Sequence, residues 1–185
     1  MKYPRILAAA FFIFSFVQGT AQGKFYTKTG KISFFSTTSV ENIEAANKSA
    51  VCLLDSKTGD LQFAVLLKGF EFKKALMQEH FNKEYVESDK FPKSEFKGQI
   101  TNNAAVTYTS NGTYPVTVKG KLILHGETKD VESVGTLTVK DGKIQATASF
   151  PVLIADYKIS VPRVYRDNIS KSIKVSVDCL LEPLK

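Results

Sequence analysis

Hydrophobic and polar residues alternate along most of the chain beyond about residue 24. The longest alternating run spans Tyr114 to His125, where an apolar residue or glycine occupies every second position as far as Leu124. Strict alternation gives a strand one buried face and one wet face, which is typical of antiparallel sheets. The dipeptide Asp141-Gly142 separates two such runs and predicts a two-residue hairpin. The pattern therefore predicts an all-β domain, either a sandwich or a barrel.

One segment departs from this period of two and predicts a helix. Between Lys74 and Val86, the apolar residues Met77, Phe81 and Tyr85 recur every four positions with polar residues between them. This spacing is typical of an amphipathic helix of about three turns. Its apolar stripe could face an ordinary core or a ligand, and an ordinary core is the commoner arrangement.

The predicted sheet could enclose either a cavity or a filled core. The run from Tyr114 is about twice the usual strand length, which favours a deep barrel. Several positions predicted to point inward carry small residues, namely Gly98, Gly120, Ser133, Gly135, Ala146 and Ala148. Small inward residues leave room for a ligand, but large residues opposite them could fill the same space. The sequence leaves both possibilities open.

The first residues have the layout of a secretory signal peptide. Lys2 and Arg5 precede an apolar run over residues 6–17, and the small residues Gly19 and Ala21 then form a cleavage motif. An apolar run of about 12 residues is short for a membrane span. We therefore expect residues 1–21 to be a signal peptide and residues 22–185 to form a single barrel domain. Cleavage near Ala21 would place the protein in the periplasm or outside the cell.

The chain is basic, with a formal net charge of +7. The basic residues are dispersed along the sequence, whereas a nucleic-acid-binding protein would gather them on one face. Dispersed charge is compatible with weak contact to an anionic membrane surface. Cys52 and Cys179 could pair in an oxidising compartment. We predict two free thiols, because Cys179 continues the apolar face of the last alternating run.

Groups suited to catalysis are few. His125, Glu127 and Asp130 lie close together and could in principle bind a metal or transfer a proton. Together with Gly126 they suit a turn between two strands equally well, and we favour the turn. The sequence contains none of the common nucleophile, zinc, redox or phosphate-loop motifs. We therefore predict no enzyme activity, no catalytic residue, no metal and no cofactor.

Four segments together resemble one known family. They are KGFEF at residues 68–72, ALMQEHFN at 75–82, SDKFPKSEFKGQI at 88–100 and VKGKLILHGETKD at 118–130. Their succession is similar to that of the YceI-like family of bacterial periplasmic proteins. The likeness extends over nearly all of the chain after the expected signal peptide and is loosest at residues 156–162.

This resemblance implies a lipocalin-like, eight-stranded antiparallel β-barrel with a short α-helix inserted between strands. It further implies a hollow interior that holds an isoprenoid or similar amphiphile by its apolar tail, for storage, transport or shielding. The alternatives are a structural or partner-binding barrel without ligand and, ranked behind it, a lipid-modifying enzyme. The oligomeric state is open, with a dimer among the options. The expected ligand-binding residues are apolar, namely Phe63, Phe70, Phe72, Leu76, Met77, Phe81, Phe91, Phe96 and Leu122.

Overall fold

The structure of the protein is a computed structural model that describes residues 23–184. The expected signal peptide, residues 1–21, lies outside the described residues. Eight long strands dominate the fold, in agreement with the alternating pattern. They are β1 (Lys24–Thr37), β2 (Asn42–Asp55), β3 (Asp60–Leu66), β5 (Lys93–Ile100), β6 (Gly112–Leu124), β7 (Glu127–Lys140), β8 (Lys143–Leu153) and β9 (Ser172–Pro183). A two-residue strand, β4 (Glu71–Phe72), pairs with β2.

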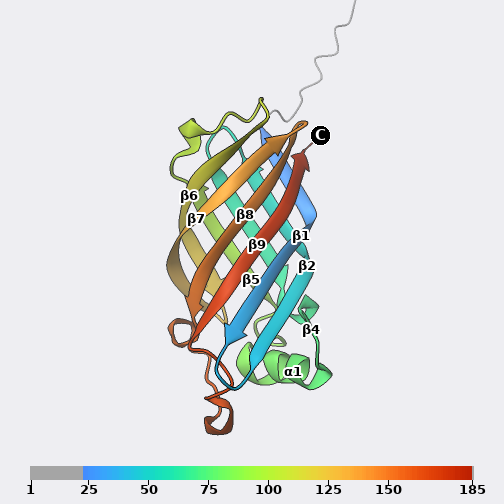
Figure 1. Cartoon of the computed structure of the whole chain (residues 1–185), viewed down its shortest axis with the longest axis vertical. Coiled ribbons are helices and arrows are strands. Elements are labelled where there is room, and N and C mark those ends of the chain that lie inside the picture. Colours follow the sequence, from blue (N-terminus) through green and yellow to red (C-terminus); the bar gives the residue numbers. More distant parts are fainter. Residues whose placement is uncertain (1–22, 185) are drawn as a thin grey trace, which may run out of the picture.

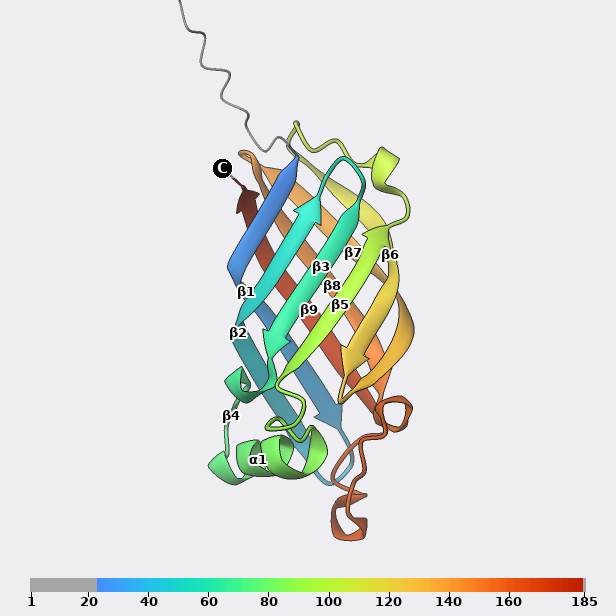
Figure 2. The same cartoon turned by 180° about the vertical axis from the view of Figure 1, so that it is seen from behind.

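The long strands close into a barrel in which every neighbouring pair is antiparallel. β1 is hydrogen-bonded to β2 on one side and to β9 on the other, so that Phe34 lies opposite both Ala45 and Val175. The remaining strands follow in the order β9, β8, β7, β6, β5, β3 and β2. Figures 1 and 2 show the resulting tall barrel from opposite sides. The prediction of an eight-stranded antiparallel barrel is confirmed.

Two tight hairpins occur where the sequence places a polar residue before glycine. Asp141 and Gly142 join β7 to β8 with φ values of 51° and 75°. His125 and Gly126 join β6 to β7 in the same way, with φ values of 52° and 77°. Positive φ at both central residues suits the right-handed twist of the flanking strands, which explains the preference for glycine at the second position.

The predicted helix is present between β4 and β5. It consists of α1 (Ala75–His80) and a π-helical turn, η2 (Phe81–Tyr85), so its length agrees closely with the predicted segment from Lys74 to Val86. The wider turn is completed by the Val86 amide, which donates to the Phe81 carbonyl at 2.9 Å. In Figures 1 and 2 this helical segment lies beneath one end of the barrel. No helix in residues 23–184 is long and apolar enough to cross a membrane.

The two ends of the barrel carry different connections. One end, which we call the mouth end, carries the β1–β2 turn at residues 38–41, the segment around α1, and residues 154–171. The last of these includes the short helices η4 (Ile154–Tyr157) and η5 (Arg163–Tyr165). The other end, which we call the closed end, carries residues 56–59, the hairpin at 141–142, and residues 101–111 with η3 (Asn103–Ala105). A further short helix, η1 (Leu67–Gly69), follows β3 at the mouth end.

The closed end is filled by a packed apolar core. Leu54, Ile144 and Leu181 have no exposed surface, and they belong to a cluster that spans most of the strands. The ring of Tyr108, from the 101–111 connection, stacks 6.2 Å from that of Phe25. Cys52 and Cys179 are buried free thiols. Burial raises the pKa of both thiols, to about 11 for Cys179.

Candidate functional site

An apolar cavity of about 480 Å³ occupies the barrel between the closed-end core and the mouth end. Its walls are the inward faces of the strands, including Val116 and Val118 of β6 and Val175 and Val177 of β9. Its lining continues to Leu76 on α1, which is 64% exposed, so the cavity reaches solvent at the mouth end. The volume falls within the range of about 300–1,000 Å³ that is usual for small-molecule sites.

Small inward residues explain part of this space. Ser133, Gly135, Ala146 and Ala148 all line the cavity, as expected of a hollow barrel. The inward glycines of β5 and β6 have a different role, because Gly98 pairs with Gly120 and the ring of Phe96 lies over both. A Cβ atom on either glycine would lie 2.6 Å from the Phe96 ring. The barrel is therefore filled at one end and hollow toward the other.

Four phenylalanines form a continuous aromatic cluster beside the mouth. Phe34 comes from β1, Phe70 and Phe72 from the segment around β4, and Phe81 from the helical segment; all four line the cavity. The Phe81 centroid lies 5.4 Å from that of Phe34, 5.7 Å from Phe70 and 5.1 Å from Phe72. Phe81 is thus the point where the helix packs on the barrel. The same rings present an apolar surface to the cavity.

The structure brings together eight of the nine residues expected to contact a ligand. The residues that line the cavity are Phe63, Phe70, Phe72, Leu76, Met77, Phe81, Phe96 and Leu122. Phe91 is not among the lining residues, which corrects its expected position. Its ring packs against His125 with a centroid distance of 4.7 Å, and the Lys90 ammonium lies over it at 4.9 Å. The π-helical turn and the residues after it carry Phe91 to the β6–β7 hairpin. A ligand-contacting role for the other eight remains a prediction.

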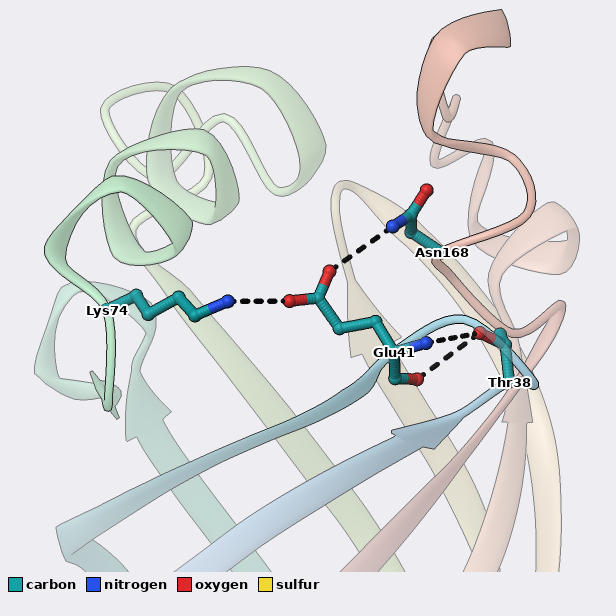
Figure 3. A network of polar contacts seen from close by, with 4 residues as sticks. All are labelled: Thr38, Glu41, Lys74 and Asn168. Carbon is teal, nitrogen blue, oxygen red and sulfur yellow. Dashed lines mark hydrogen bonds and ion pairs between the residues drawn. The ribbon is translucent and has the colours of Figure 1, made fainter.

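Glu41 joins three segments at the rim of the cavity (Figure 3). Its carboxylate accepts hydrogen bonds from Lys74 Nζ at 2.8 Å and from Asn168 Nδ2 at 3.3 Å. Its backbone is held by Thr38, whose hydroxyl accepts from the Glu41 amide at 3.1 Å. The bond from the Lys74 ammonium lowers the pKa of Glu41 below its ordinary value. The β1–β2 turn is thereby tied both to the start of α1 and to the 154–171 segment.

A second contact crosses the mouth on α1. The His80 and Tyr165 rings meet edge to face at 5.7 Å, and His80 Nδ1 lies 3.2 Å from the Glu84 carboxylate on the next helical turn. Both His80 and Tyr165 line the cavity. The helical segment and residues 154–171 therefore enclose the mouth from two sides and meet through this aromatic contact.

His125 serves the turn between β6 and β7, as favoured from the sequence. Its Nε2 lies 2.8 Å from a Glu87 carboxylate oxygen and its Nδ1 lies 2.9 Å from the Tyr157 carbonyl. These two contacts fix the orientation of the ring in the turn. The other two candidates engage elsewhere, Glu127 with Lys158 and Asp130 with Lys121. Within residues 23–184 no three histidine, cysteine or acidic side chains are arranged to hold a metal.

Several lining residues were missing from the expected set. Phe34 lies on an alternating face and could have been included on that ground. The residues from the 154–171 segment, namely Ile154, Ile159, Val161, Tyr165, Asn168 and Ile169, follow no period that would reveal them. The pairing of Glu41 with Lys74 was not predicted either, because these residues come together only when distant segments meet at the mouth.

Comparison with known proteins is consistent with this architecture. A sequence profile of the YceI-like domain family matches residues 8–181. A polyisoprenoid-binding domain from Saccharophagus degradans, described as implicated in plant cell wall breakdown, superimposes with a TM-score of 0.76. It is 13% identical, and the match covers 88% of this chain and 99% of that one.

Two further solved structures share the fold. BcnA from Burkholderia cenocepacia is 17% identical with a TM-score of 0.66, covering 82% of this chain and 95% of its own. A YceI protein from Campylobacter jejuni is 16% identical with a TM-score of 0.53, covering 71% and 78%. A search of curated protein sequences found no significant match.

Proposed function

Since this chain belongs to the YceI-like domain family, we propose that it binds an isoprenoid or a similar amphiphile by its apolar tail inside the barrel. The observation that carries the proposal is the cavity of about 480 Å³, which is lined by apolar strand faces and reaches solvent at one end. The structural similarity to a polyisoprenoid-binding domain supports the same class of ligand.

The hydrophobic effect alone can supply the affinity. Burial of a methylene group is worth about 0.8 kcal/mol, so ten carbons contribute up to about 8 kcal/mol before the cost of ordering the tail. The four-phenylalanine cluster offers contact surface near the mouth, and the strand faces offer it deeper in the barrel. The polar end of such a ligand would stay near the rim, where Glu41, Lys74 and Asn168 are found.

We further propose that the protein acts after export, in the periplasm or outside the cell. The basic start, apolar run and small residues around Ala21 support this location. Storage, transport or shielding of a water-insoluble molecule in an aqueous compartment would require an apolar cavity of this kind. We propose binding in preference to catalysis because the polar residues that line the cavity near its rim are already engaged in pairs, Glu41 with Lys74 and His80 with Glu84.

Mass spectrometry of lipid extracted from the purified mature protein tests the proposal. We expect a stoichiometric isoprenoid or related amphiphile, and we expect the delipidated protein to rebind farnesol or a longer polyprenyl phosphate. Ala148→Phe should reduce the bound lipid several-fold, because Ala148 lines the cavity and a ring there would occupy the space of the tail.

Ser149→Phe provides a matched control on the same strand. Ser149 is exposed and does not line the cavity, so this variant should retain the lipid content of the wild type. Absence of lipid from the wild-type protein, together with failure to rebind either probe, would contradict the proposal. Equal loss of lipid in both variants would also contradict it, because the effect would then not depend on the cavity.

A further inference from the structure

Exposed hydrophobic side chains are distributed unequally between the two ends of the barrel. Within residues 23–184, four large hydrophobic residues outside the strands are exposed, namely Val40, Leu76, Val164 and Tyr165. All four lie on mouth-end segments, and Val164 on η5 has the largest exposed fraction, 77%. At the closed end, by contrast, Val106 is buried and Tyr108 is partly buried. Among the segments that connect the strands, exposure of large apolar side chains is therefore a feature of the mouth end.

Basic residues surround this apolar surface. Arg163 and Arg166 flank Val164 and Tyr165, and all four side chains are exposed. Residues 154–171 also contain Lys158 and Lys171, against the two acidic residues Asp156 and Asp167. Lys158 is paired with Glu127. None of the ion pairs formed within residues 23–184 involves Arg163, Arg166 or Lys171. The segment therefore carries a net positive charge, and three of its basic side chains are not neutralised by an ion pair within residues 23–184.

The position of the segment matters as much as its composition. In Figures 1 and 2 residues 154–171 extend past α1 and form the extremity of the mouth end. Tyr165 lines the cavity, whereas Arg163, Val164 and Arg166 do not. We call residues 163–166 the tip. The tip has one aromatic ring turned toward the cavity and three side chains that are directed elsewhere and exposed.

We propose that the tip docks the mouth of the barrel onto an anionic lipid bilayer. Basic side chains are attracted to anionic headgroups within a Debye length, and an adjacent apolar side chain can enter the boundary between headgroups and acyl chains. Docking in this orientation faces the open cavity toward the membrane. If the barrel binds a lipid as proposed above, docking in this orientation lets the apolar tail enter the cavity from the membrane without crossing water.

Vesicle co-sedimentation of the mature protein tests the docking site. The probes are vesicles of phosphatidylethanolamine with phosphatidylglycerol, and neutral vesicles of phosphatidylcholine. We expect binding to the anionic vesicles that weakens with added salt, and much weaker binding to the neutral ones. Arg163→Glu/Arg166→Glu should weaken binding to anionic vesicles by about tenfold or more. Val164→Glu should weaken it by a smaller factor.

Matched variants away from the mouth separate docking from general electrostatics. Lys97→Glu/Lys140→Glu makes the same change in net charge on exposed strand positions that form no ion pair within residues 23–184. Val134→Glu alters a residue on β7 that is 73% exposed, similar to Val164. Both controls should bind anionic vesicles nearly as well as the wild type. Equal losses in controls and tip variants would overturn the proposal.

Two other results would also overturn it. Wild-type binding by the tip variants would show that the tip is not the contact. A change from a self-associated state to a monomer in Val164→Glu, with vesicle binding intact, would assign the tip to contact between two copies of this chain.

Lipid content, measured on the same preparations, distinguishes failure of the docking proposal from failure of the ligand-binding proposal. The tip variants leave the cavity lining unchanged, so they should lose docking and keep their lipid. In the wild-type protein, bound lipid without vesicle binding would contradict the docking proposal alone. Vesicle binding without bound lipid would contradict the ligand-binding proposal alone.

Discussion

The closed end and the mouth end of the barrel are made by the same strands, yet their interiors differ. At the closed end Leu54, Ile144 and Leu181 have no exposed surface and pack against one another within one cluster. Toward the mouth, inward positions on the same sheet carry Ser133, Gly135 and other small residues, and a cavity remains.

The segments that cover the two ends also differ. The closed-end connection contributes Tyr108, whose ring stacks on Phe25 and completes the core. The mouth-end segments meet through the Glu41 network and the His80–Tyr165 contact, and both lie at the rim. Alternation therefore builds a wall with an apolar inner face, while residue size and the covering segments decide whether the enclosed space is filled. Stability should depend mainly on the closed end and ligand capacity on the mouth end.

Thiol labelling should give the largest difference between the two ends. Cys52 and Cys179 lie in the closed end, and burial raises the pKa of both thiols, which keeps them in the unreactive protonated form. Labelling in the native state then requires opening of the core, which should slow it about a thousandfold or more relative to an exposed thiol. Leu76→Cys supplies that exposed reference at the mouth. Mass analysis over time under native conditions measures both rates.

Denaturant provides the control for this labelling experiment. Without reductant, the unfolded wild-type protein should take up two labels, since both cysteines are free thiols in the structure. Native labelling of Cys52 or Cys179 at a rate similar to that of the Leu76→Cys thiol would contradict the expected difference between the two ends. It would mean that the closed end opens as readily as the mouth.

Leucine truncation should separate the two regions by stability. Leu54→Ala removes a side chain with no exposed surface from the packed cluster and should cost about 3–5 kcal/mol of unfolding free energy. Leu122→Ala removes a leucine that borders the existing cavity, so fewer contacts are lost and the cost should be about 1–2 kcal/mol. Urea unfolding of delipidated protein measures both. Equal costs would indicate that the hollow region is as tightly packed as the closed end.

Phenylalanine truncation should show that the two ends differ in their contribution to ligand binding. Phe81→Ala removes a ring that contacts three other phenylalanines and the cavity, and it should lower the stabilisation conferred by bound farnesol by about 1 kcal/mol. Phe25→Ala removes a closed-end ring that does not line the cavity. It should lower the stability of the ligand-free protein while leaving the ligand-induced shift unchanged. Thermal unfolding with and without farnesol measures both; an unchanged shift in Phe81→Ala would contradict the assignment.

The sequence predicted the walls of the site better than its opening. Alternation places Phe63, Phe96 and Leu122 on inward faces, and the four-residue spacing places Met77 and Phe81 toward the cavity, because both periods follow from local backbone geometry. Phe91 was misplaced because the residues after Tyr85 follow neither period. The Glu41 network was not predicted at all, since its partners Lys74 and Asn168 lie 33 and 127 residues away in the sequence. Such contacts depend on closure of the barrel.

The smallest expected effect concerns the pH dependence of the mouth, where Glu41 has a lowered pKa because of its bond from Lys74. A carboxyl group whose pKa is lower in the folded protein stabilises the fold above the unfolded value and loses that effect as the pH falls through the folded value. The contact between the turn at 38–41 and its two partners should therefore weaken as the pH falls below the ordinary value of 4.5.

We expect faster release of farnesol from the wild-type protein over that range, and fast release from Glu41→Gln already at neutral pH. Glu79→Gln is the matched control, because the pKa of Glu79 is also lowered by an exposed lysine partner, Lys83. That ion pair lies within the helical segment and does not connect it to another segment. If Glu79→Gln changes the release rate as much as Glu41→Gln does, the effect belongs to the helix and not to the bridge across the mouth.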